Sequence, residues 1–123
     1  MNIQDNLQQK ELCEIIIRYL YGNDADVEAY KVFHDPYADS GNCDLRGVDV
    51  TPYDYTTEEN SNKALISYDN KIKEAMRTAG FGESYEGQWW ADIGESIFKA
   101  VFTSKASKIH DPDKSFIAIY QKS

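Results

Sequence analysis

The chain is 123 residues long, enough for one domain with a single hydrophobic core. Hydrophobic residues make up 41% of it and aromatic residues 13%, which excludes an intrinsically disordered chain. The formal net charge is −8 and the lysines and arginines form no basic stripe, so direct binding of nucleic acid is not expected. We therefore expect a single domain over residues 1–123.

No segment of the sequence predicts contact with a membrane. Residues 1–6 have neither the basic region nor the apolar core of a secretory signal, and the longest aliphatic run is Ile15–Ile17. Cys13 and Cys43 are too few for a disulfide framework, and neither has the electropositive surroundings of a reactive thiol. A cytoplasmic protein with two inert cysteines is the interpretation that follows.

Helical spacing predicts a first helix from about Gln4 to Tyr21, ended by Gly22. Its apolar residues recur at i, i+3, i+4, i+7 and i+8, namely Leu12, Ile15, Ile16, Tyr19 and Leu20. The next segment, residues 27–34, fits either a short helix or a strand. Its tyrosine, valine and phenylalanine favour a strand, which Pro36 would end.

Residues 35–60 are rich in Pro, Gly, Asp, Asn, Ser and Thr, which predicts a loop with one short strand. The strand has few apolar positions, at Leu45, Val48 and Val50, and Pro52 closes it. A long irregular segment in a compact domain is usually functional, so this is where we expect the binding residues.

Two more helices are expected in the second half of the chain. A capping box at Thr56–Glu59 opens a helix whose apolar stripe runs from Ala64 to Ala79, before Gly80. Residues 81–87 are typical of a turn. Residues 88–103 predict a third helix, because one helical face would carry Trp90, Ile93, Ile97 and Val101.

The apolar run Phe116–Tyr120 predicts a buried strand over residues 115–121. A buried strand needs partners, and the candidates are residues 27–34 and 44–51. The expected element order is α-β-β-α-α-β. The predicted fold class is therefore α+β, with a small, mostly antiparallel sheet of two to three strands packed against three helices.

The net charge is concentrated in one segment. Residues 24–62 contain ten of the 21 acids but only two of the 13 bases, so this segment alone carries −8. Charge of one sign attracts a basic peptide or protein surface, and tyrosines, which are frequent at interface hot spots, lie among the acids. The candidate partner-binding residues are Asp35, Tyr37, Asp39, Asp44, Asp49, Tyr53, Asp54, Tyr55, Glu58 and Glu59.

These features favour a small acidic binding or inhibitor protein that engages a basic site on a partner protein, with no cofactor and no catalytic residue. Nuclease inhibitors, immunity proteins and phage anti-defence proteins have this size and charge, which is an analogy and not a shared motif. A solvated acidic loop that only aids solubility is the simpler interpretation of the same segment. The sequence leaves the identity of the partner and the oligomeric state open.

The alternative function depends on the tripeptide His-Asp-Pro, which occurs twice and contains both histidines of the chain. If the two stretches converge, His34, Asp35, His110 and Asp111 would suit a Zn²⁺ or Mn²⁺ site in a small metal-dependent enzyme. Asp-Pro also initiates turns, and the ligand spacing of known metal motifs is absent, so two turns are the simpler interpretation.

Overall fold

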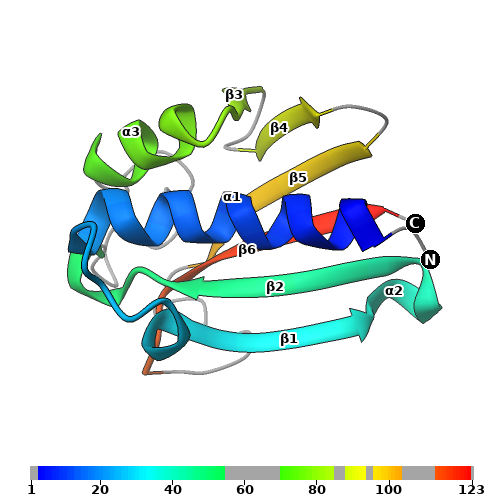
Figure 1. Cartoon of the computed structure of the whole chain (residues 1–123), viewed down its shortest axis with the longest axis horizontal. Helices are drawn as coiled ribbons and strands as arrows, with labels where there is room; N and C mark the ends of the chain where they lie inside the picture. Colours follow the sequence, from blue (N-terminus) through cyan, green and yellow to red (C-terminus); the bar gives the residue numbers. More distant parts are fainter. Residues whose placement is uncertain (1–2, 55–69, 85–87, 94–95, 104–112, 123) are drawn as a thin grey trace, which may run out of the picture.

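The computed structural model describes residues 3–54, 70–84, 88–93, 96–103 and 113–122. A six-stranded antiparallel sheet forms its centre, in the strand order β1-β2-β6-β5-β4-β3 (Figure 1). The strands are β1 (Lys31–Tyr37), β2 (Cys43–Asp49), β3 (Gly82–Glu83), β4 (Gln88–Ile93), β5 (Ser96–Thr103) and β6 (Phe116–Lys122). The helices are α1 (Ile3–Tyr21), α2 (Ala38–Gly41) and α3 (Asn70–Thr78), with 3₁₀ turns η1 (Val27–Tyr30) and η2 (Thr51–Tyr53).

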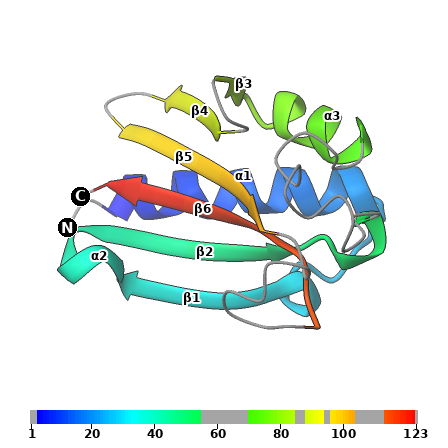
Figure 2. The ribbon, with the colours of Figure 1, turned by 180° about the vertical axis from the view of Figure 1, so that it is seen from behind.

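Helices α1 and α3 cover the same face of the sheet. In Figure 1 α1 passes in front of β6, and in Figure 2, seen from behind, it lies beyond the strands. One buried cluster joins both helices to this face, through Ile16 of α1, Met76 of α3, and Phe98 and Ile119 of the sheet, each no more than 1% exposed. We call this the helix face, and the opposite one the open face.

Strand β6 is buried on both sides. Ile117 and Ile119 belong to the cluster under the helices, whereas Phe116 and Ala118 form a second cluster with Leu45 on the open face. Alternation of side chains along a strand produces this division. The prediction of a buried strand at residues 115–121 is therefore confirmed.

The predicted size of the sheet is wrong, because residues 88–103 form strands β4 and β5 and not a third helix. Burial along β5 alternates strictly, from Ser96 inward and Ile97 outward to Phe102 inward. The same apolar residues fit one side of a helix, but they are largely aromatic and β-branched, and such residues favour strands. The sheet therefore has six strands where two to three were expected, within a fold that is still α+β.

Of the other predicted elements, the predicted turn at residues 81–87 contains β3, β1 continues past Pro36 to Tyr37, and β6 pairs with β2 and β5 and not with residues 27–34. Helix α1 lies where helical spacing places it, and Gly80, at φ 103°, follows the end of α3. The ambiguous residues 27–34 divide into η1 and the first half of β1. The predicted capping box at Thr56–Glu59 lies outside the described residues.

A buried glutamine fixes α1 to the sheet. Gln9 is fully buried, and its side-chain amide donates to the backbone carbonyl oxygens of Asp44 (2.9 Å) and Ile119 (3.1 Å). Its Oε1 accepts a hydrogen bond from Nε of Arg46 at 2.8 Å. An unsatisfied buried amide would cost free energy, so these bonds favour one position of α1 over β2 and β6.

The burial of two neighbouring residues of β5 leads to opposite predictions for their substitution. Phe98→Ala is expected to lower the free energy of unfolding by about 3–5 kcal/mol, because the ring is fully buried and its removal leaves a cavity. Ile97→Ala should cost less than about 1 kcal/mol, because that side chain is 53% exposed. Urea denaturation of both variants measures the difference. Equal losses would contradict the strand assignment of residues 96–103.

Candidate functional site

The described residues of the acidic segment, 24–54, divide into an exposed part and a more buried part. The exposed part is residues 24–42, which we call the acidic edge: it comprises η1, β1 and α2 and follows one edge of the sheet. Its five carboxylates are all exposed, and with one lysine they leave a formal charge of −4; they belong to Asp24, Asp26, Glu28, Asp35 and Asp39. Lys31 pairs with Glu28 at 2.6 Å. Among the described strands, β1 pairs only with β2.

The end of β1 holds the most exposed aromatic side chain described. Tyr37 is 77% exposed, and its backbone N–H donates to the carboxylate of Asp35 at 2.9 Å. Asp39 and Ser40 follow with positive φ angles of 53° and 60°, a conformation that aspartate tolerates better than most residues. The hydrogen bond thus ties Tyr37 to Asp35 at the end of β1, and Asp39 follows in the short connection to β2.

Asp44 is placed on the helix face beside a histidine. Its Oδ1 lies 2.9 Å from Nε2 of His34, and its side chain is only 16% exposed. Asp35, the neighbour of His34 in sequence, pairs with Leu45 on the open face. His34 and Asp35 therefore point to opposite faces of the strand, as adjacent strand residues do.

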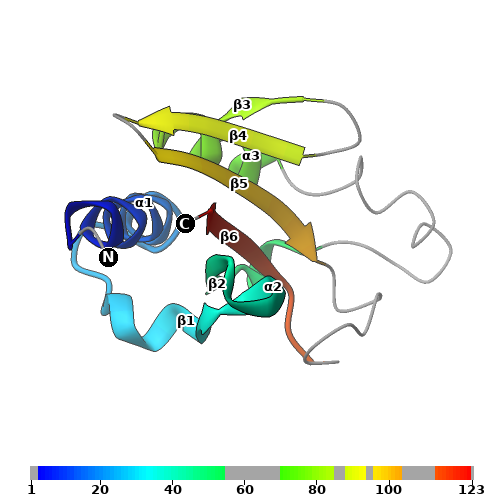
Figure 3. The ribbon, with the colours of Figure 1, turned by 90° about the vertical axis from the view of Figure 1, so that its right-hand side faces the viewer.

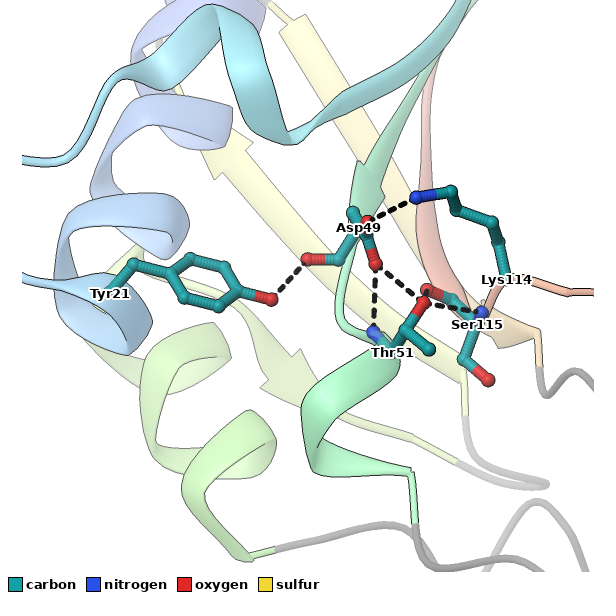
Figure 4. Close-up of polar contacts among 5 residues, drawn as sticks. All are labelled: Tyr21, Asp49, Thr51, Lys114 and Ser115. Carbon is teal, nitrogen blue, oxygen red and sulfur yellow. Dashed lines mark hydrogen bonds and ion pairs between the residues drawn. The ribbon is translucent and has the colours of Figure 1, made fainter.

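Asp49 is buried in a polar network at the far end of β2 (Figure 4). Its carboxylate accepts hydrogen bonds from the Thr51 hydroxyl (2.6 Å) and amide (2.9 Å), and it pairs with Nζ of Lys114 at 3.0 Å. The Thr51 hydroxyl oxygen accepts in turn from the amide of Ser115 at 3.0 Å. The hydroxyl of Tyr21, at the end of α1, donates to the carbonyl oxygen of Asp49 at 2.6 Å. The network joins α1, β2 and the start of β6.

The pKa of Asp49 shows how the protein holds this charge. Burial alone raises the pKa of the carboxyl, but the hydrogen bonds from Thr51 and the pairing with Lys114 together outweigh it, so the pKa lies below its usual range. Asp49 is therefore ionised in the folded protein at neutral pH. Its negative charge is compensated within the protein by Thr51 and Lys114.

Asp54 and Tyr53 also have internal roles. Asp54 is 7% exposed and accepts a hydrogen bond from the hydroxyl of Ser115. The Tyr53 hydroxyl donates to the carbonyl oxygen of Leu20 at 2.5 Å, and its ring lies 5.8 Å from that of Tyr21. Both residues hold η2 against neighbouring elements.

The structure thus brings together only part of the predicted binding set. Asp35, Tyr37 and Asp39 share one exposed surface, whereas Asp44, Asp49, Asp54 and Tyr53 contribute to packing. The predicted residues Tyr55, Glu58, Glu59, His110 and Asp111 lie outside the described residues. Within the described ranges, no group of three or more His, Cys, Asp or Glu side chains is placed to hold a metal ion. No described helix is long and apolar enough to span a membrane.

Two exposed apolar residues were not among the predicted site residues. Trp90 and Ile97 were assigned to the core of a third helix, but they are 43% and 53% exposed on the open face. The sequence signal that favours strands here is the abundance of aromatic and β-branched residues, because apolar and polar residue types do not alternate along residues 96–102.

Comparison with protein-family models, with curated proteins and with solved structures finds no match. Function is therefore inferred from the geometry of the chain itself.

Replacing Asp49 with Asn is expected to lower the free energy of unfolding by about 1–3 kcal/mol at neutral pH, because the charge-assisted bonds weaken. The native pKa of Asp49 is depressed, so its stabilisation is present above the unfolded-state value of about 3.9 and is lost as the pH falls through the native value. The gap between wild type and variant should accordingly close at acid pH in denaturation experiments. Asp92→Asn, at an exposed carboxylate, is the control. A gap that is unchanged by pH would contradict an ionised Asp49.

Proposed function

We propose that this chain is a small acidic binding protein whose acidic edge engages a basic surface on a partner protein, in the manner of nuclease inhibitors, immunity proteins or phage anti-defence proteins. One observation carries the proposal: five exposed carboxylates are distributed along one sheet edge, whose strand β1 ends in a tyrosine that is 77% exposed. The combination supplies a charged surface of one sign and an aromatic anchor.

The negative charge of the acidic edge supports the proposal. Four of its five negative charges are not balanced by a base within residues 24–42. Exposed charges of one sign attract a basic surface over roughly 8–10 Å at physiological salt and raise the association rate. Asp49 contributes little to this field because Lys114 pairs with it.

Tyr37 supports the proposal as the contact that would hold the complex. Tyrosine adds a large contact area at a low cost in side-chain entropy and is enriched among residues that dominate binding energy. The bond from its amide to Asp35 already restrains the backbone, so less ordering is left for the moment of binding.

The metal-enzyme alternative receives no support from the described residues. His34 already bonds to Asp44, and Asp35 bonds to the amide of Tyr37. We therefore do not propose a second function.

Neutralising the edge should slow association with a basic partner. The variant Asp24→Asn/Asp35→Asn/Asp39→Asn reduces the net charge from −8 to −5, while asparagine can still accept the Tyr37 amide and tolerates the backbone of residue 39. We expect an association rate lower by about tenfold at low salt, with the loss shrinking as salt rises.

A matched control separates the edge from the net charge. The variant Glu74→Gln/Glu83→Gln/Asp92→Asn changes the charge equally at exposed positions on α3, β3 and β4. The partner is first identified by placing a photo-crosslinking amino acid at position 37 in the native host, and the rates are then measured with the purified pair. Equal slowing by both variants, or a captured partner without a basic surface, would contradict the proposal.

Tyr37→Ala should act on the dissociation rate instead. Because the side chain is largely exposed in the free protein, its removal should leave the melting temperature nearly unchanged. Loss of an aromatic anchor should weaken binding by about 1–2 kcal/mol or more, mainly through faster dissociation. An unchanged dissociation rate would place the contact elsewhere on the edge.

A further inference from the structure

The open face of the sheet carries exposed apolar side chains at the end formed by β4 and β5. Trp90 and Ile97 are 43% and 53% exposed. In the strand register Trp90 lies opposite Lys99, and Ile97 lies opposite Asp92. Trp90 and Ile97 are thus diagonal neighbours on one face, within reach of each other for side chains of this size.

The direction of these side chains follows from their neighbours. Trp89, the neighbour of Trp90 in sequence, and Phe98, the neighbour of Ile97, are buried in the cluster under α1 and α3. Residues next to each other on a strand point to opposite faces, so Trp90 and Ile97 point away from the helices. Figure 3 shows the sheet nearly edge-on, with α1 on one side of it.

The same row of side chains continues onto β6. Lys99 lies opposite Tyr120, and its ammonium sits 4.7 Å from the centre of that ring. Val101, two residues along β5 from Lys99, is half-buried. We define the β4–β5 patch as Trp90, Asp92, Ile97, Lys99, Val101, Tyr120 and Lys122.

The other end of the open face is already closed. Phe33 of β1 packs edge-on against Phe116 with ring centroids 5.1 Å apart, and it lies over Gly47 of β2. Leu45 and Phe116 are there only 7% and 1% exposed. Apart from Tyr37 at the end of β1, the exposed apolar side chains described on this face therefore lie at the β4–β5 end.

The charges around the β4–β5 patch are of both signs. Asp92 and Lys122 are exposed, and Lys99 is half-buried. This surface differs from the acidic edge, where the formal charge is −4. Two copies that each carry −8 repel one another, so they can associate only where the local charge is close to balanced.

We propose that the β4–β5 patch binds a second copy of this chain in a symmetric dimer. A two-fold interface places the same patch on both subunits and must be self-complementary, which an apolar centre bordered by an aspartate and lysines satisfies. Antiparallel sheets pack face to face at about 10 Å, so a second sheet is a suitable cover for the exposed Trp90 and Ile97. The acidic edge contributes no residue to the β4–β5 patch, and the dimer does not rest on the proposed function.

The first experiment measures mass in solution by sedimentation equilibrium with the full chain. The wild type should reach twice the chain mass of 14.1 kDa as concentration rises, and Ile97→Lys and Trp90→Thr should raise the dimer dissociation constant by about tenfold or more. Ile15→Lys, at a residue of α1 that is 37% exposed, is the matched control and should remain dimeric. A monomeric wild type at about 1 mM overturns the proposal, as does a dimer that both patch variants leave unchanged.

A charge-exchange experiment tests the symmetry and does not depend on the apolar variants. Asp92→Lys makes the patch wholly basic, and Lys99→Glu/Lys122→Glu makes it wholly acidic, so each should dimerise more weakly than the wild type. Mixed together, the two should form a heterodimer at least about tenfold tighter than either homodimer. Failure of the mixture to associate overturns the proposed interface even if the wild type is dimeric.

Discussion

Burial of β6 between β2 and β5 is the constraint on which the rest of the molecule depends. Ile117 and Ile119 are fully buried under the helices, and Phe116 and Ala118 are buried on the other side. A strand that is apolar on both faces requires a hydrogen-bonded neighbour along each edge, because unpaired backbone groups would otherwise be buried without partners. Strand β2 supplies one of these neighbours although its sequence carries aspartates.

The pairing of β2 with β6 determines which acidic side chains of β2 are buried. Once β2 lies beside β6, Asp44 and Asp49 occupy partly or largely buried positions, and each has acquired a partner, His34 for one and Lys114 for the other. A buried carboxylate without such a partner would take up a proton or destabilise the fold. The carboxylates of η1, β1 and α2 are exposed and need no such compensation. Among the described residues of the segment, the acidic edge is thus the part whose carboxylates stay outside the core.

Sequence reasoning recovers the elements whose spacing is unambiguous. Helix α1 and strand β6 follow from helical periodicity and from a continuous apolar run, and both are observed. Residues 88–103 were misassigned because Trp90, Ile93 and Ile97 satisfy a helical stripe, while residues 96–102 alternate in burial but not in apolar and polar residue types. Gly94, between the two strands in sequence, is typical of a short hairpin connection and was the missed signal.

The division of the acids was beyond sequence reasoning for a different reason. Asp49 is paired with a lysine 65 positions later in the chain, and Asp54 with the next residue, Ser115. No local sequence pattern predicts these contacts, because they form only when β2 pairs with β6. Composition could therefore locate the acidic segment, but it could not separate Asp35 and Asp39, which are exposed, from Asp49 and Asp54, which are buried.

Strand order places Trp90 farther from the acidic edge than the range of screened charge interactions. From β1 to β4 the sheet crosses four strand spacings, which at about 4.8 Å each amounts to roughly 19 Å. That distance is about twice the screening length of roughly 8–10 Å at physiological salt. A basic partner on the acidic edge would therefore change the field at Trp90 very little, whereas Tyr120 on β6 lies closer to the edge and its pKa is raised by burial and in part by Asp39. The separation of Trp90 from the edge follows from the insertion of β6 and β5 between β2 and β4, that is, from the burial of the strand beside which Asp49 lies.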